Sequence, residues 1–164
     1  MSGVLLELGK SGEHGVEKGT HAVLRSGAVV GTLRSSSWKE EATAVVGDRE
    51  WAFGKRKSEL VARWAVEPED AAARLSARQE SMLKGTWTID LGGTPVDVEV
   101  ASIWKGSHRY SRNGQQIAES GTSGGWSMLP TLTVDQDLPD EHAVFLLWFE
   151  LVLSRRTAAV AAAT

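Results

Sequence analysis

The sequence predicts a mainly β protein, a closed antiparallel β-barrel that encloses a hydrophobic C-terminal α-helix. The first observation is an apolar run at residues 143–153, interrupted only by Glu150, that has no polar face. A helix that is apolar on every side must be covered on every side. The second is its length, which is below the roughly 20 residues of a bilayer span and typical of a buried helix. The third is that almost everything before it reads as short strands, so strands must supply the cover.

Length and composition limit the class of protein. The chain has 164 residues, which fits one domain, and its formal net charge is -3. A pI near 5.8 argues against a nucleic-acid-binding protein, because such domains usually have a pI above about 9. Without cysteine there is no thiol nucleophile, disulfide or Cys-ligated zinc, and a reducing compartment is permitted. The first ten residues lack the pattern of a secretory signal, so we expect a cytoplasmic location.

Glycine residues indicate a flexible segment and a hairpin turn in the N-terminal half of the chain. Residues 1–19 are glycine-rich and predict a flexible N-terminal segment, with the barrel domain over residues 20–156. A first hairpin is expected over residues 21–33, turning at Ser26 and Gly27. A second is expected over residues 43–53, where alternation places Trp51 and Phe53 on one face.

The middle of the chain reads as strands with one ambiguity. Residues 60–66 alternate as a strand does, and residues 86–100 predict a hairpin turning at Gly92 and Gly93. Residues 68–82 have two readings. Their Pro-Glu-Asp start before three alanines is typical of a helix, whereas their flanks are β, so helix and strand both stay open.

The last hairpin and the sheet closure precede the helix. Residues 107–112 and 115–120 are joined at Asn113 and Gly114, the strongest hairpin signal in the chain. Residues 121–125 lack the lysine of a phosphate-binding loop and open a strand, so we expect a flexible loop. Residues 126–134 should close the sheet.

The central helix is expected over about residues 138–156, with Asp137 as its N-terminal cap and an alanine-rich tail at residues 157–164 that extends it or frays. Glu150 lies inside the apolar run, where an unpaired charge is costly, so it needs a partner. Arg63 or Arg49 on a strand is the expected partner.

Two segments carry a likeness to known proteins. Residues 110–119 read Tyr-Ser-Arg-Asn-Gly-Gln-Gln-Ile-Ala-Glu, and at residues 137–147 an Asp-Leu-Pro-Asp-Glu-His entry precedes the apolar helix. Together with the hairpins they resemble the tubby C-terminal-like superfold, and the helix entry is similar to that of LURP-one-related, scramblase-like bacterial proteins. The resemblance covers most of residues 20–156 and implies a closed barrel of about twelve strands around the helix. Tubby domains bind phosphoinositide headgroups through clustered Lys and Arg, whereas the cysteine-rich segment of scramblases has no counterpart here.

The candidate ligand-binding residues are basic. Lys55, Arg56 and Lys57 form the densest basic run, and Arg109 and Arg112 extend it if folding brings them to the same surface. A protein of net negative charge must concentrate positive charge locally to approach an anionic surface. The alternative is a solvated hairpin end, which is what most charge runs are.

Other chemistry is not indicated. The four histidines have no metal-ligand spacing, and we find no GxSxG elbow or Ser-His-Asp pattern, so we predict no catalytic residue, no metal ligand and no cofactor. Trp51, Trp87 and Trp148 are expected in the core. Trp38 and Trp104 each precede a lysine near a turn and are expected at the surface.

These observations predict a non-enzymatic, tubby-like binding module for an anionic lipid headgroup or a protein partner. Two alternatives are an enzyme with an unrecognised site and a purely structural interaction protein. A cleft with several perturbed titratable groups would favour the enzyme, and a large exposed apolar patch would favour the interaction protein.

Overall fold

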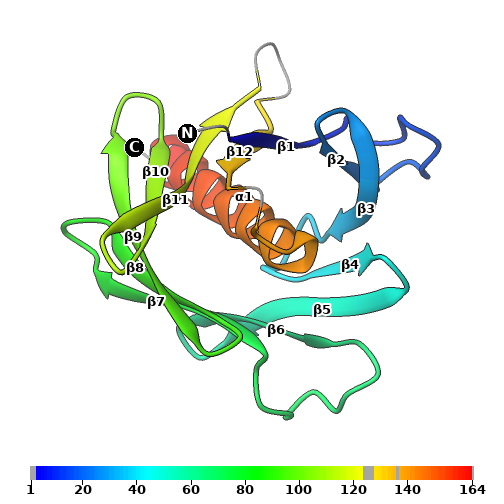
Figure 1. Ribbon diagram of the computed structural model, residues 1–164, viewed down its shortest axis with the longest axis horizontal. Helices are drawn as coiled ribbons and strands as arrows, with labels where there is room; N and C mark the ends of the chain where they lie inside the picture. The colour runs from blue at the N-terminus through cyan, green and yellow to red at the C-terminus, as the bar shows by residue number, and fades with distance from the viewer. Residues whose placement is uncertain (1–2, 124–127, 136, 164) are drawn as a thin grey trace.

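The computed structural model describes residues 3–123, 128–135 and 137–163. Within these residues, twelve antiparallel strands form a closed barrel around one helix, as predicted (Figure 1). Each strand pairs with its neighbours in sequence, and β1 pairs with β12 to close the ring. The elements are β1 (Val4–Leu8), β2 (His21–Arg25), β3 (Ala28–Ser35), β4 (Ala42–Val46), β5 (Arg49–Arg56), β6 (Glu59–Trp64), β7 (Leu75–Ser81), β8 (Thr86–Leu91), β9 (Thr94–Ser102), β10 (Ser107–Arg112), β11 (Gln115–Thr122), β12 (Pro130–Val134) and α1 (Asp140–Ala163).

The hairpins lie where the turn residues predicted them. Asn113 and Gly114 between β10 and β11 have φ values of 51° and 76°, and Gly92 and Gly93 between β8 and β9 have 67° and 96°. Two successive positive φ angles define the type I′ turn, whose twist matches that of the flanking strands. The turn chemistry therefore sets the register of these hairpins.

The N-terminal segment corrects one prediction. Residues 1–19 were expected to be flexible, but Val4–Leu8 form β1, which pairs with both β2 and β12. Leu6 and Leu8 point into the core and are buried. Glycine content is a local signal, whereas closing a ring of strands requires a partner for β12, and that requirement outweighs it.

The ambiguous segment at residues 68–82 is a loop followed by a strand. Residues 65–74 connect β6 to β7 on the outside of the barrel, and β7 fills the gap between β6 and β8. Leu75 and Ala77 face inward and are buried. The alanines that favoured a helix lie in the loop. The pairing of residues 75–81 with β6 and β8 outweighs the helix propensity of the segment.

The helix begins two residues later than the expected start at about residue 138, and the alanine-rich tail takes the first of its two readings and extends it. It starts at Asp140, and Pro139 rather than Asp137 stands before its first turn, with the Pro139 carbonyl accepting hydrogen bonds from the His142 and Ala143 amides. At the other end, the alanine-rich tail continues the helix through Ala163. Every residue from Ala143 to Val152 is buried, which confirms the enclosed helix.

Aromatic rings join the helix to the barrel wall. Phe53 of β5 contacts Phe145 and Trp148 of α1 at ring-centroid distances of 5.5 and 5.3 Å, and Trp87 of β8 meets Phe149 at 5.0 Å. Such edge and tilted contacts add to the free energy gained by burial. The predicted core tryptophans are therefore in the core, and Trp126 lies outside the described residues.

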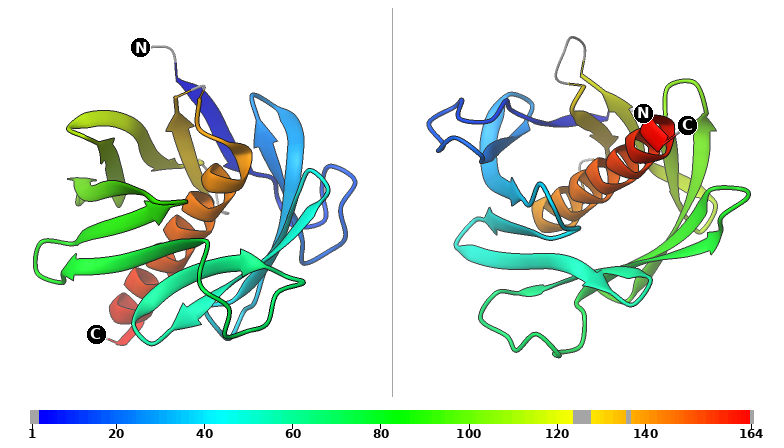
Figure 2. Two further views of the ribbon diagram at one scale, coloured as in Figure 1. Left: turned by 60° about the horizontal axis from the view of Figure 1, so that its bottom comes forward. Right: turned by 180° about the vertical axis from the view of Figure 1, so that it is seen from behind.

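The barrel has two distinct ends because adjacent strands alternate in direction. At the helix-entry end, Arg25 of β2 forms a 2.7 Å ion pair with Asp140 in the first turn of α1. At the helix-exit end, Arg155 bonds to Ser35 at the end of β3, and Arg156 bonds to Glu40 in the β3–β4 loop. Figure 2 shows α1 running obliquely through the ring between them. The helix-exit end carries loops 9–20, 36–41, 57–58, 82–85 and 103–106 and residues 123 and 128–129, and the helix-entry end carries loops 26–27, 47–48, 92–93 and 113–114, residues 135 and 137–139 and both ends of the 65–74 loop.

The enclosed helix makes a stability prediction. Phe145 and Leu147 are fully buried, so replacing either by alanine leaves a cavity that a closed ring of strands cannot collapse to fill. We expect each variant to lose about 3–5 kcal/mol in the free energy of unfolding, measured by chemical denaturation. Val160→Ala on the exposed part of the helix is the control and should change it by less than about 0.5 kcal/mol. Unchanged denaturation of both core variants would contradict an enclosed helix.

Candidate functional site

The five predicted basic residues do not form one patch. Lys55 and Arg56 lie near the end of β5, and Lys57 forms the turn that follows. Arg109 and Arg112 lie on β10, and four strands separate β5 from β10 in the ring. The prediction that Arg109 and Arg112 extend the basic turn is therefore wrong, because the two groups of residues lie on different parts of the barrel.

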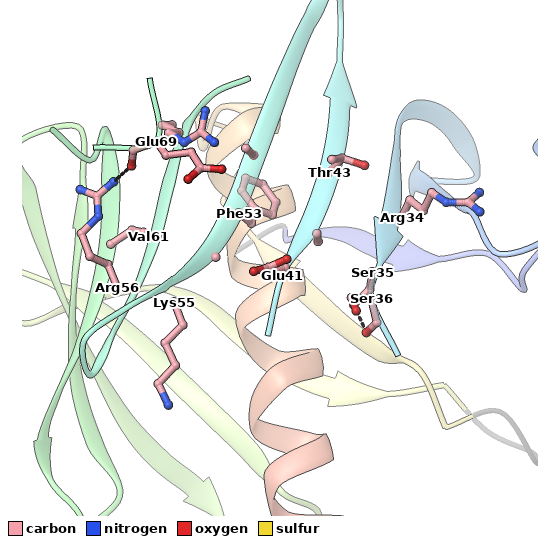
Figure 3. A pocket seen from close by; sticks show the side chains of 14 residues that line it. Arg34, Ser35, Ser36, Glu41, Thr43, Phe53, Lys55, Arg56, Val61 and Glu69 are labelled. Atoms are coloured by element: carbon pink, nitrogen blue, oxygen red, sulfur yellow. Dashed lines mark hydrogen bonds between the residues drawn. The ribbon is translucent and has the colours of Figure 1, made fainter. Parts of the chain in front are cut away.

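Arg56 has a structural role. Its guanidinium donates to the backbone carbonyls of Ala71 at 2.9 Å and Glu69 at 2.6 Å, which ties the 65–74 loop to the barrel wall. In Figure 3, Arg56 points toward Glu69 while Lys55 points away from it. The two neighbours thus face different sides of β5, as alternation in a strand requires.

Arg109 and Arg112 are also engaged locally. Arg109 lies 3.5 Å from Glu99 and 3.7 Å from Glu119, carboxylates on the two strands beside it. The Nε atom of Arg112 is buried, and its charge contributes to the lowered pKa of His142 in the first turn of α1. Arg109 is therefore paired with the carboxylates beside it, whereas Arg112 lies beside the first turn of α1, away from the basic turn.

A groove of about 520 Å³ crosses the outer wall over β3 to β6 (Figure 3). Its lining includes four basic side chains, Arg34, Lys55, Arg56 and Arg63, and the carboxylates Glu41 and Glu69. Arg56 and Arg63 already donate to backbone carbonyls, and the two carboxylates offset part of the positive charge, so the groove does not present one sign of charge. Within the described residues, no group of three or more His, Cys, Asp or Glu side chains is placed to hold a metal ion.

The exposed positive charge gathers instead at the helix-exit end. All seven lysines of the chain are exposed, and all lie in the loops of this end or, for Lys55, beside one. Lys55 is 3.9 Å from Glu40, whose carboxylate also binds Arg156 at 2.6 Å. That bond holds the pKa of Glu40 below its usual value. The lysines are Lys10, Lys18, Lys39, Lys55, Lys57, Lys84 and Lys105.

The two ends carry opposite charge. The helix-exit loops and the helix beyond Val152 contain eight basic and four acidic residues: Lys10, Lys18, Lys39, Lys57, Lys84, Lys105, Arg155 and Arg156 against Glu13, Glu17, Glu40 and Glu41. The loops that start and end at the helix-entry end, together with the first turn of α1, contain one basic and eight acidic residues: Arg74 against Asp48, Glu67, Glu69, Asp70, Asp135, Asp137, Asp140 and Glu141. Of these, Glu69 lies over the outer wall beside Arg56. The net charge of -3 therefore conceals a strong asymmetry along the barrel.

Exposed apolar side chains follow the same asymmetry. Of the eight most exposed large apolar side chains among the described residues, seven lie at the helix-exit end and only Val66 lies at the other. Trp38 and Trp104 are 94% and 98% exposed, as predicted from the lysines that follow them. Every second turn of an antiparallel barrel lies at the same end. Counting the strands in the sequence is therefore enough to predict that these apolar residues share an end. The seven are Trp38, Met82, Leu83, Ile103, Trp104, Met128 and Val160.

Glu150 has partners that sequence reasoning missed. Its carboxylate accepts a hydrogen bond from the Tyr110 hydroxyl, and His108 Nδ1 lies 3.0 Å from each of its oxygens. The expected partners are engaged elsewhere: Arg63 donates to backbone carbonyls outside the barrel, 2.7 Å from that of Glu67, and Arg49 stacks on Trp64. The partners of Glu150 therefore lie on the inward face of β10, and neither of them is an arginine.

Within the buried cluster of Glu150, Tyr110 and His108, each side chain is either a hydrogen-bond donor or an acceptor. A carboxylate offers only acceptors, so a hydrogen bond from His108 to Glu150 is donated by Nδ1–H. Burial, together with the adjacent carboxylate, raises the pKa of Tyr110 well above its ordinary value, so its hydroxyl stays a donor. The three side chains fix the rotation of α1 against β10.

In the described part of the chain, no helix is long and apolar enough to cross a membrane. Comparisons with models of protein families, with curated proteins and with solved structures found no match to this chain. The resemblance to the tubby-like superfold stays a prediction.

The cluster predicts a measurable coupling. Tyr110→Phe removes one donor to Glu150 while keeping the ring, so we expect the free energy of unfolding to fall by about 1–3 kcal/mol. In a Glu150→Leu background the same substitution should cost less, because the hydroxyl has then lost its acceptor. Chemical denaturation of the four proteins of this cycle measures the coupling. Additive effects would contradict the hydrogen bond as a stabilising contact.

His142 predicts a loss of stability in mild acid. Burial lowers its pKa below the model-compound value of 6.5, and Arg112 lowers it further, against an opposing effect of Glu141. Below about pH 6.5 the unfolded chain therefore binds a proton that the folded chain does not, so the free energy of unfolding decreases as the pH falls. We expect His142→Gln to flatten this slope between pH 7 and the folded-state pKa, as measured by denaturation at several pH values. An equal slope in both proteins would contradict the assignment.

Proposed function

We propose that the protein is a non-enzymatic binding module that attaches to anionic lipid surfaces through the helix-exit end of its barrel. The observation that carries the proposal is the opposite charge of the two ends. A molecule of net negative charge approaches an anionic surface only if it is oriented with its positive end forward. The lysines at this end, each exposed, supply the attraction.

The basic turn at Lys55–Lys57 forms part of this end but is not the whole site. Arg56 is occupied by the 65–74 loop, so replacing it would disturb the barrel wall as well as any ligand contact. Lys39, Lys84 and Lys105 are exposed on three other turns of the same end. These three lysines therefore provide a cleaner test than the basic turn does.

The test is flotation with vesicles of phosphatidylcholine and phosphatidylglycerol, beside vesicles of phosphatidylcholine alone. We expect the parent protein to float only with the anionic vesicles, and less well at high salt. Replacing Lys39, Lys84 and Lys105 by glutamine should weaken binding roughly a hundredfold, because each lysine near the surface contributes about 1 kcal/mol. The thermal midpoint should change little, since exposed charges contribute little to stability.

A matched control separates local charge from net charge. Ala28→Glu, Val66→Glu and Gln115→Glu together lower the net charge by the same amount at exposed positions near the helix-entry end. This control should bind the anionic vesicles as the parent does. An equal loss in the control, or a parent that floats with neither vesicle, would overturn the proposal.

A further inference from the structure

Three turns at the helix-exit end repeat one short motif. Residues 36–39, 81–84 and 102–105 each read Ser-x-(Trp or Leu)-Lys. In each, the serine Oγ accepts a hydrogen bond from the backbone N–H of the lysine three residues on, at 3.2, 3.1 and 3.3 Å. A side chain that bonds the backbone in this way fixes the shape of a turn. The chain thus makes the same serine-to-lysine hydrogen bond in three segments at one end.

The motif presents its apolar residues to solvent. Trp38, Leu83 and Trp104 are each more than nine-tenths exposed, and Met82 and Ile103 beside them are 85% exposed. The turn itself depends on the serine and the backbone, so its geometry does not require an apolar residue at the tip. Exposed apolar groups of this size mark a surface that contacts something other than water.

We propose that the three Ser-x-(Trp or Leu)-Lys turns insert their apolar tips into the interfacial layer of an anionic lipid bilayer. Their lysines then lie at the level of the lipid phosphates. The inference rests on the proposed function and adds to it how the barrel holds the membrane. Tryptophan and lysine suit this position because each has an apolar body and a polar end.

The arrangement of the turns favours a bilayer over a protein partner. They join β3 to β4, β7 to β8 and β9 to β10, and the β5–β6 turn that carries Lys57 lies between the first two in the ring. The 82–85 and 103–106 turns are therefore neighbours, whereas the 36–41 loop is set apart from them, so the apolar groups are spread around the end of the barrel. A broad lipid surface can receive all of them, and its negative charge complements the adjoining lysines.

The helix end limits how deep the barrel can sit. Arg155 and Arg156 lie where α1 leaves the barrel, held by hydrogen bonds to Ser35 and Ser36 and by the ion pair with Glu40. These charged groups resist transfer into hydrocarbon. Contact is therefore expected at the interface, through the tips, without a spanning segment.

The test replaces the tips and keeps the charge. The tip variant carries Trp38→Ser, Leu83→Ser and Trp104→Ser and retains all the lysines, and Val66→Ser at the other end is the control. On vesicles of phosphatidylcholine and phosphatidylglycerol, we expect each lost tip to weaken binding about tenfold. Binding left in the tip variant should vanish at high salt, whereas part of the parent's binding should persist. Both variants should keep the parent's thermal midpoint.

Fluorescence gives a second measurement. Vesicles with brominated acyl chains should quench part of the tryptophan emission of the parent and of Val66→Ser, and much less of the tip variant, whose remaining tryptophans include the buried core rings. If the tip variant binds and is quenched like the parent, insertion is wrong although attraction by charge stands. If the parent binds no vesicle, both proposals fail. If the parent forms dimers through the tips and the variant does not, without a difference on vesicles, the tips form an interface between copies and the inference is overturned.

Discussion

The structure depends on the enclosure of one apolar helix. Ten successive residues of α1, from Ala143 to Val152, are buried, and in this protein a closed ring of strands covers all sides of the segment. The closure in turn recruits Val4–Leu8 as a strand, because β12 would otherwise expose an unpaired edge. The helix and the ring therefore stabilise each other through the core that they share.

Enclosing the helix buries the carboxylate of Glu150, which then needs hydrogen-bond partners inside the barrel. Glu150 is 5% exposed, and its carboxylate is stabilised by Tyr110 and His108 on the inward face of β10. A buried charge with two donors costs less than an unpaired one and accepts only one rotation of the helix. The cluster thus fixes how α1 sits in the ring, which in turn decides where Arg155 and Arg156 leave it.

The same topology separates the two ends chemically. Strand alternation sends every second turn to one end, and those turns carry the lysines, the exposed tryptophans and the repeated serine motif. The acidic loops and the acidic first turn of α1 collect at the other end. Placing opposite charge at the two ends gives the molecule an orientation toward charged surfaces without a large net charge.

The sequence alone determined the barrel, the enclosed helix and most hairpins, because hydrophobic periodicity and turn residues such as Asn113 and Gly114 act locally. It also indicated Trp38 and Trp104 as surface residues. Only the tertiary structure decided the role of residues 4–8, the strand at 75–81 and the partners of Glu150, since each depends on a neighbour distant in sequence. The candidate site follows the same division: Lys57 was readable as a basic turn, but whether Arg109 and Arg112 joined it depended on the order of strands around the ring. That order also brings turns 36–39, 81–84 and 102–105 to one end, because hydrogen bonding between strands acts across the sheet and not along the chain.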